Sequence, residues 1–84
     1  MLTIMIDGSR YNAAREVHQA LKKMLSLPDY YGMNADALND CLSVHMVPVN
    51  LWILDPGTGE VADTIRLVSN VFSDNGGIVK ELYA

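Results

Sequence analysis

The chain has 84 residues, of which 50% are hydrophobic and 19% are charged, and its formal net charge is −4. We expect one small globular domain spanning residues 1–84, because this composition is not that of a disordered chain and its apolar runs fall far short of the roughly 20 residues of a membrane span. The negative charge argues weakly against binding nucleic acid through its phosphates.

The first half of the chain predicts three elements. Residues 2–6 form an apolar run ended by a turn-forming pair, which predicts a strand. Asn12 is the expected cap of a first helix, whose apolar side repeats at three- and four-residue steps until Pro28 stops it. Asn34 is the expected cap of a second helix that runs to about Val44.

The second half predicts a strand, a helix and a strand. Residues 49–54 form the second strand, and the unbroken apolar stretch Leu51–Leu54 favours a strand that is covered on both faces. The third helix carries apolar residues at helical spacing from Val61 to Phe72, and residues 78–83 form the third strand. The order β-α-α-β-α-β predicts an α/β fold with helices packed on a three-stranded parallel sheet.

Acidic and basic residues are separated along the chain. No lysine or arginine occurs from Met24 to Ile65, whereas six acidic residues fall in that span. Such asymmetry predicts an acidic face, whose simplest role is to keep the protein soluble. The single cysteine, Cys41, excludes an internal disulfide, and no export leader opens the sequence, so we expect a cytoplasmic protein.

Two aspartates mark the second helix. Asp36 and Asp40 lie four residues apart on one face, where like charges cost about 0.2–0.5 kcal/mol, and no basic residue of this helix relieves them. The pair suits a cationic partner, although, taken alone, it favours an ordinary solvated face. Tyr30, Tyr31 and Gly32 come just before, and they are typical of binding surfaces, although we expect one tyrosine to belong to the core.

The segment from Leu27 to Leu42, LPDYYGMNADALNDCL, resembles the characteristic region of the barstar family of intracellular inhibitors of barnase-type ribonucleases. Residues 17–23 extend the resemblance into the first helix. It implies that the second helix and the preceding loop fill the active-site cleft of a small basic ribonuclease, with carboxylates in place of RNA phosphates. It also implies a bacterial immunity protein or antitoxin that is monomeric when free, forms a 1:1 complex, and needs no cofactor, metal, nucleic acid or membrane.

The resemblance assigns partner contacts to seven residues. Asp36 and Asp40 match the two principal acids of the family, and Asp74 is the nearest match to an acidic contact on a later helix. The other implied contacts are Tyr30, Gly32, Asn34 and Asn39.

Two positions in this region depart from the family pattern. Asn39 stands where the family has a tryptophan, and Met33 stands where it has an acid. Two alternatives therefore stay open, namely an inhibitor or immunity protein for a different toxin, and a protein-interaction module without a nuclease target.

Three unrelated roles compete for the same side chains. His18, His45 and Cys41 are candidate catalytic groups, but Cys41 has no nearby cation and no nucleophile or phosphate-loop motif occurs, so we expect no catalytic residue and no enzyme. Asp36 and Asp40 alone would bind Mg²⁺ or Ca²⁺ poorly. Self-association through the acidic face would bring like charges together across a two-fold axis.

Overall fold

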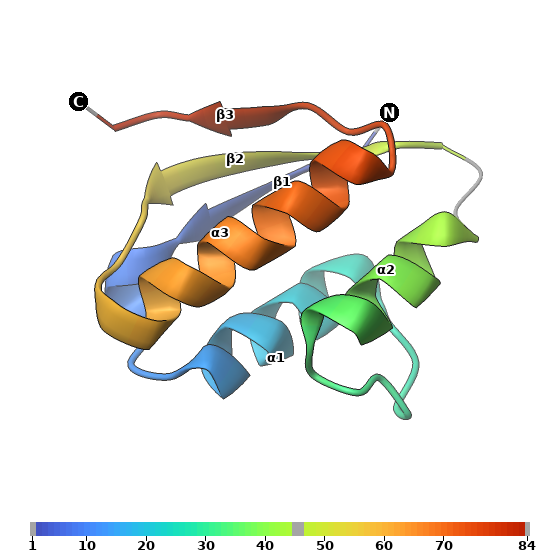
Figure 1. Cartoon of the computed structure of the whole chain (residues 1–84), viewed down its shortest axis with the longest axis horizontal. Coiled ribbons are helices and arrows are strands. Elements are labelled where there is room, and N and C mark those ends of the chain that lie inside the picture. Colours follow the sequence, from blue (N-terminus) through green and yellow to red (C-terminus); the bar gives the residue numbers. More distant parts are fainter. Residues whose placement is uncertain (1, 45–46, 84) are drawn as a thin grey trace.

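The predicted α/β fold is confirmed by a computed structural model, which describes residues 2–44 and 47–83 (Figure 1). His45, one of the candidate catalytic groups, lies outside the described residues. No helix among the described residues is long and apolar enough to cross a membrane. The elements in chain order are β1 (Leu2–Asp7), the 3-10 helix η1 (Gly8–Arg10), α1 (Ala14–Leu25), α2 (Ala35–Ser43), β2 (Val49–Asp55), α3 (Gly59–Asp74) and β3 (Val79–Glu81).

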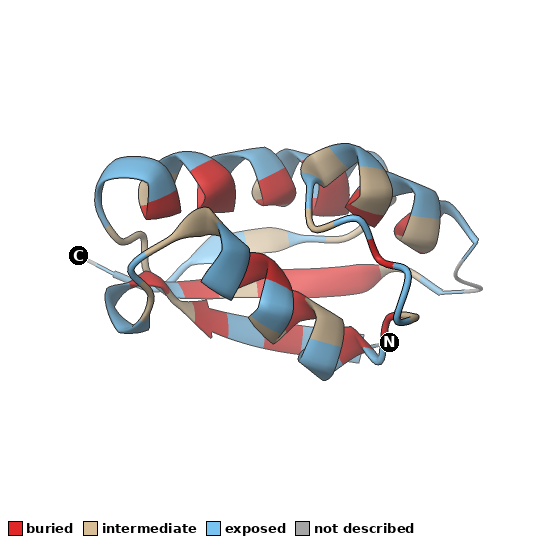
Figure 2. Cartoon of the chain, turned by 90° about the horizontal axis from the view of Figure 1, so that it is seen from below, coloured by how far each residue is buried: buried red, intermediate tan, exposed pale blue. Residues whose placement is uncertain are grey.

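The three strands form one parallel sheet in the order β1-β2-β3, and the helices lie on one face of it (Figures 1 and 2). In β1, Ile4 and Ile6 are buried while Met5 between them is 50% exposed. Leu54 of β2 is likewise 42% exposed. The expectation of a strand covered on both faces is therefore wrong, because alternate side chains of β2 point to the side without helices.

One contact on the open face of the sheet explains how an apolar strand tolerates solvent there. The ammonium group of Lys80 lies 5.5 Å from the centroid of the Trp52 ring. A cation over an indole ring is favourable, and the lysine stem covers part of the ring. The unbroken apolar stretch of β2 thus combines a buried face with a partly shielded one.

The helix α3 is the centre of the helical layer. It packs on β2 and contacts both α1 and α2, and the main tertiary contacts of α2 are with α3. The predicted apolar positions of α3 are all buried, and they are Val61, Ile65, Val68 and Phe72. The position of α2 is therefore set by α3.

Both ends of α1 differ from the prediction. Its N-cap is Ala13, which makes no side-chain cap bond, whereas Asn12 donates its backbone N–H to Oε1 of Glu16 at 2.6 Å. The helix stops before Pro28 is reached, because Ser26 adopts a left-handed conformation with φ of 53°. The N–H of Ala14, the first residue of α1, donates instead to Oε2 of Glu60 in α3 at 2.7 Å, and Ser26 ends the helix before the proline is reached.

A tight connection joins α3 to β3. Gly76 has a φ of 86°, which favours glycine, and a Cβ on Gly77 would collide with the carbonyl oxygen of Val49. The strand that follows is shorter than the predicted 78–83, since only Val79–Glu81 has strand geometry.

Candidate partner-binding site

The loop before α2 is anchored by a buried hydrogen-bonded pair. Tyr31 and His18 are each 5% exposed, and the Tyr31 hydroxyl lies 2.7 Å from Nδ1 of His18 and 3.4 Å from the carbonyl oxygen of Asn34. A neutral His18 with its proton on Nδ1 satisfies both contacts, because it donates to Tyr31, whose hydroxyl donates to Asn34. The start of α2 is thereby tied to α1.

Burial perturbs the pKa of both members of this pair. Desolvation lowers the pKa of His18 below its ordinary value of 6.5. Desolvation, followed by the nearby Cys41, raises the pKa of Tyr31 to about 12. Both side chains are therefore uncharged at neutral pH, as a buried pair requires.

Tyr31 is the core tyrosine, and its neighbour Tyr30 points outward. The side chain of Tyr30 is 87% exposed, which makes it the most exposed large hydrophobic residue of the described chain. A large ring held in solvent on an anchored loop is available for contact with another protein. The predicted division of the two tyrosines into one core and one surface residue is confirmed.

Asn34 caps α2 as predicted and shapes the loop around Gly32. Its Oδ1 accepts the N–H of Ala37 at 2.8 Å, while its Nδ2 donates to the carbonyl oxygen of Gly32 at 3.1 Å. A Cβ at Gly32 would lie 3.1 Å from the Cβ of Ala37, so the loop approaches the first turn of the helix closely. Both polar ends of the Asn34 side chain are therefore used within the protein.

The two carboxylates of α2 are exposed and form no ion pair with a described residue. Asp36 lies in the first turn of the helix, where the helix dipole favours a negative charge, and Asp40 follows one turn later. None of the ion pairs within the described part of the chain includes Asp36 or Asp40. Lys22 of α1 pairs with Asp29 in the loop before α2, at 3.6 Å. The face of α2 thus presents uncompensated negative charge.

Asn39 links α2 to the end of α3. Its Oδ1 accepts a hydrogen bond from Nδ2 of Asn75 at 2.8 Å, and the same nitrogen donates to the carbonyl oxygen of Val71 at 2.8 Å. Asn75 follows Asp74 directly, and Asp74 is exposed at the last position of α3. This contact brings the neighbourhood of Asp74 to α2, although the two elements are distant in the sequence.

A groove of about 530 Å³ separates the Tyr30 loop from the outer side of α2. Tyr30 and Asp40 both line it, so two of the predicted residues meet there. Val44, which is 77% exposed, also lines it. The other lining residues are Leu25, Ser26, Leu27, Pro28 and Cys41. A mostly apolar groove with one carboxylate can receive a long side chain whose end is cationic.

All seven predicted contact residues are exposed. Asn34 is hydrogen-bonded to Gly32, and Tyr30 and Asp40 share the groove. The sequence interpretation missed the groove and the His18–Tyr31 pair, because residues 13 positions apart show no shared pattern. No three metal-ligating side chains gather in the part of the chain that the structure describes.

Two comparisons with known proteins bear on this surface. The family model described as Barstar (barnase inhibitor) matches residues 1–66, which contain β1, α1, α2, β2 and the first part of α3. The Bacillus subtilis (strain 168) protein named "Putative ribonuclease inhibitor YrdF" is 49% identical over 43 residues. Those residues cover 51% of this chain and 47% of the relative, so the similarity spans about half of each.

Proposed function

The chain belongs to the family of barstar, the barnase inhibitor, and from this premise we propose that it inhibits a small basic ribonuclease of the barnase type. In this proposal α2 and the loop before it enter the active-site cleft of the enzyme. The protein itself has no catalytic role, and it forms a 1:1 complex as a bacterial immunity protein.

The uncompensated carboxylates of α2 carry this proposal. A ribonuclease cleft holds cations that bind the phosphates of RNA, and Asp36 and Asp40 offer charges of the same sign as phosphate. Both carboxylates are exposed, and no ion pair within the described residues neutralises them. They therefore lose no internal partner when a cationic cleft replaces water around them.

The neighbouring groups supply contact area and a fixed geometry. The exposed ring of Tyr30 and the groove that it shares with Asp40 would receive a cationic side chain of the enzyme. The cap of Asn34 and the buried Tyr31 hold this loop before binding, which lowers the entropic cost of association. Gly32 and Asn39 lie beside these groups, and Asp74 adds a further negative charge from α3.

The test is a titration of barnase with the purified protein, read by cleavage of a fluorescent RNA oligonucleotide. We expect activity to fall linearly and to vanish at one equivalent of inhibitor when both proteins are well above Kd. The Asp40→Ala variant removes a carboxylate that would be buried against cations, so its Kd should rise at least about 30-fold. Asp36→Ala should weaken binding in the same direction.

Asp63→Ala is the matched control. This carboxylate is also exposed, but it lies in the first half of α3 and pairs with Arg66 at 3.0 Å. Its removal should change Kd less than about twofold, and circular dichroism should show that all three variants fold. An Asp40→Ala effect below about fivefold would mean that the main contact is elsewhere. A wild-type protein that leaves barnase active in excess would refute a barnase-type target.

A further inference from the structure

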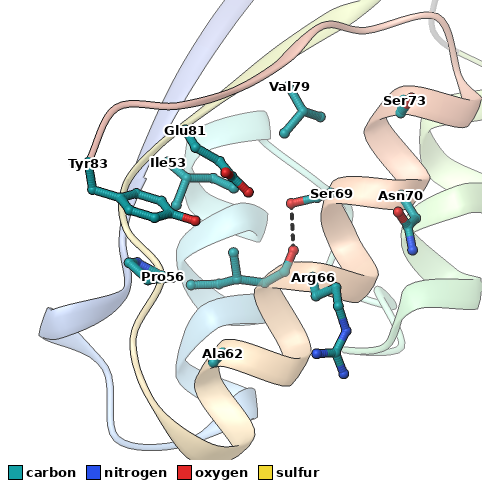
Figure 3. Close-up of a pocket in the computed structure, with 11 residues that line it drawn as sticks. Ile53, Pro56, Ala62, Arg66, Ser69, Asn70, Ser73, Val79, Glu81 and Tyr83 are labelled. Atoms are coloured by element: carbon teal, nitrogen blue, oxygen red, sulfur yellow. Dashed lines mark hydrogen bonds between the residues drawn. The ribbon is translucent and has the colours of Figure 1, made fainter.

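A second groove runs between α3 and β3, and in Figure 1 α3 lies between β3 and α2. Its volume is about 480 Å³. The apolar lining includes Ile53, Ile65 and Val79, and the polar lining includes Ser69, Asn70 and Glu81 (Figure 3). None of these residues belongs to the proposed ribonuclease surface.

The outer border of the groove is a free sheet edge. β3 is the last strand of the sheet, so it has a neighbouring strand on one side only. The carbonyl oxygen of Ile78 accepts from β2 at 3.0 Å, and the N–H of Leu82 donates to β2 at 2.8 Å. Backbone groups alternate in direction along a parallel strand, so those of Val79 and Glu81 point to the border, where no described segment lies.

The side chains of these same two residues face the groove. Val79 and Glu81 pair in register with buried residues of β2, whereas Lys80 between them pairs with Trp52 on the open face. In Figure 3 the side chain of Glu81 extends from β3 toward Ser69 of α3. A strand added at this border would therefore place alternate side chains beside Glu81, at the distance of cross-strand neighbours.

The β3 side of the groove is negative. The pKa of Tyr83, which lines the groove, is raised first by desolvation and then by the carboxylates of Glu81 and Asp55. The cation of the opposite wall, Arg66, pairs with Asp63 at 3.0 Å, and Figure 3 shows its side chain extending away from Glu81. A cationic group entering the groove would thus find a carboxylate that no described lysine or arginine neutralises.

We propose that this groove binds an extended peptide segment of a protein partner, which adds as a fourth strand beside β3 and places a lysine or arginine next to Glu81. Strand addition combines backbone hydrogen bonds with pockets for alternate side chains, and Val79 and Glu81 supply both. The edge is only three residues long, so the interface is small and the complex is transient. Because α2 stays free, this partner and a ribonuclease can bind together.

The probe is a capped six-residue peptide of alternating threonine and valine with one central lysine, titrated into the ¹⁵N-labelled full chain. We expect amide shifts at residues 79–81 and on the facing turns of α3. A matched peptide with glutamate in place of the lysine should bind about fivefold more weakly, since one exposed charge pair is lost and a repulsion gained. Glu81→Gln should abolish this preference. Asp29→Asn, the same charge change in the loop before α2, should preserve it.

Two N-methylated peptides test the backbone pairing without altering the protein. Methylation of alternate amides on one edge of the lysine peptide should abolish binding, and methylation of the other edge should leave it intact. Equal binding of both forms, shifts that map to α2, or an unchanged lysine preference in Glu81→Gln would each overturn the proposal. Amide shifts at residues 79–81 that change with protein concentration alone, together with a dimer in sedimentation, would also overturn the proposal. A second copy of the chain would then occupy the edge.

Discussion

Replacing Tyr31 by phenylalanine removes one hydroxyl from the anchor of the candidate site. That hydroxyl contacts Nδ1 of His18 at 2.7 Å and the carbonyl oxygen of Asn34 at 3.4 Å. The ring of Tyr31 is part of the core and stays in place, so the loss is polar. A typical net hydrogen bond contributes about 0.5–1.5 kcal/mol, and a buried group left without its partner costs about 1–3 kcal/mol. We therefore expect the free energy of unfolding to fall by about 2 kcal/mol.

Urea denaturation followed by far-UV circular dichroism measures this change, with Tyr30→Phe as the matched control. Tyr30 is 87% exposed, so loss of its hydroxyl should change stability by less than about 0.5 kcal/mol. In a domain of this size, a loss of about 2 kcal/mol lowers Tm by roughly 8–16 °C, which a thermal melt also detects. If Tyr31→Phe were as stable as Tyr30→Phe, the buried pair would not hold the loop, and the preorganisation argued for the site would be wrong.

Three further predictions follow from other contacts. Burial lowers the pKa of His18 below 6.5, so below that pH the unfolded chain binds the proton first and the free energy of unfolding must fall. In a His45→Gln background, urea unfolding should show this loss between pH 7.5 and 5.5, and His18→Gln should remove it; an equal loss with and without His18 would contradict the prediction. The association rate with barnase, measured by stopped flow, should fall at least about tenfold between low and high salt, and a flat response would exclude electrostatic steering. Gly77→Ala should lose more than about 2 kcal/mol of stability in a thermal melt, because the added Cβ meets the carbonyl oxygen of Val49. Gly59→Ala has open space around the added Cβ but a φ of 57°, so it should lose only about 1–2 kcal/mol, and equal losses in the two variants would rule out the steric explanation.

The order of elements and the cap at Asn34 were predictable because local chemistry decides them. Apolar residues at helical spacing in α3 are buried as expected, and the side chain of Asn34 does bond to the first turn of α2. Asn12 failed as a cap, because Ala13 takes that position and the N–H of Ala14, the first residue of α1, donates to Oε2 of Glu60 in α3 at 2.7 Å. Local signals identify which element forms, and neighbouring side chains decide where it ends.

The open face of the sheet and the groove beside Tyr30 could not be predicted, because they depend on three-dimensional packing. The stretch Leu51–Leu54 is equally apolar on both faces, and only the placement of every helix on one side leaves Leu54 partly in solvent. The same holds for His18 and Tyr31, which meet because α1 lies beside the loop before α2. The positions of Asp36 and Asp40 on one face followed from helical spacing alone.

The dependence of α2 on α3 has a consequence for the making of the protein. α2 has its main tertiary contacts with α3, whose buried residues include Val68 and Phe72, beyond the end of the segment that the family model matches. A nine-residue helix is unstable alone, so we expect α2 to become ordered only once α3 has been synthesised and can pack on it. Translation products that end before α3 should therefore lack an ordered α2 and bind the proposed ribonuclease target far more weakly than this chain.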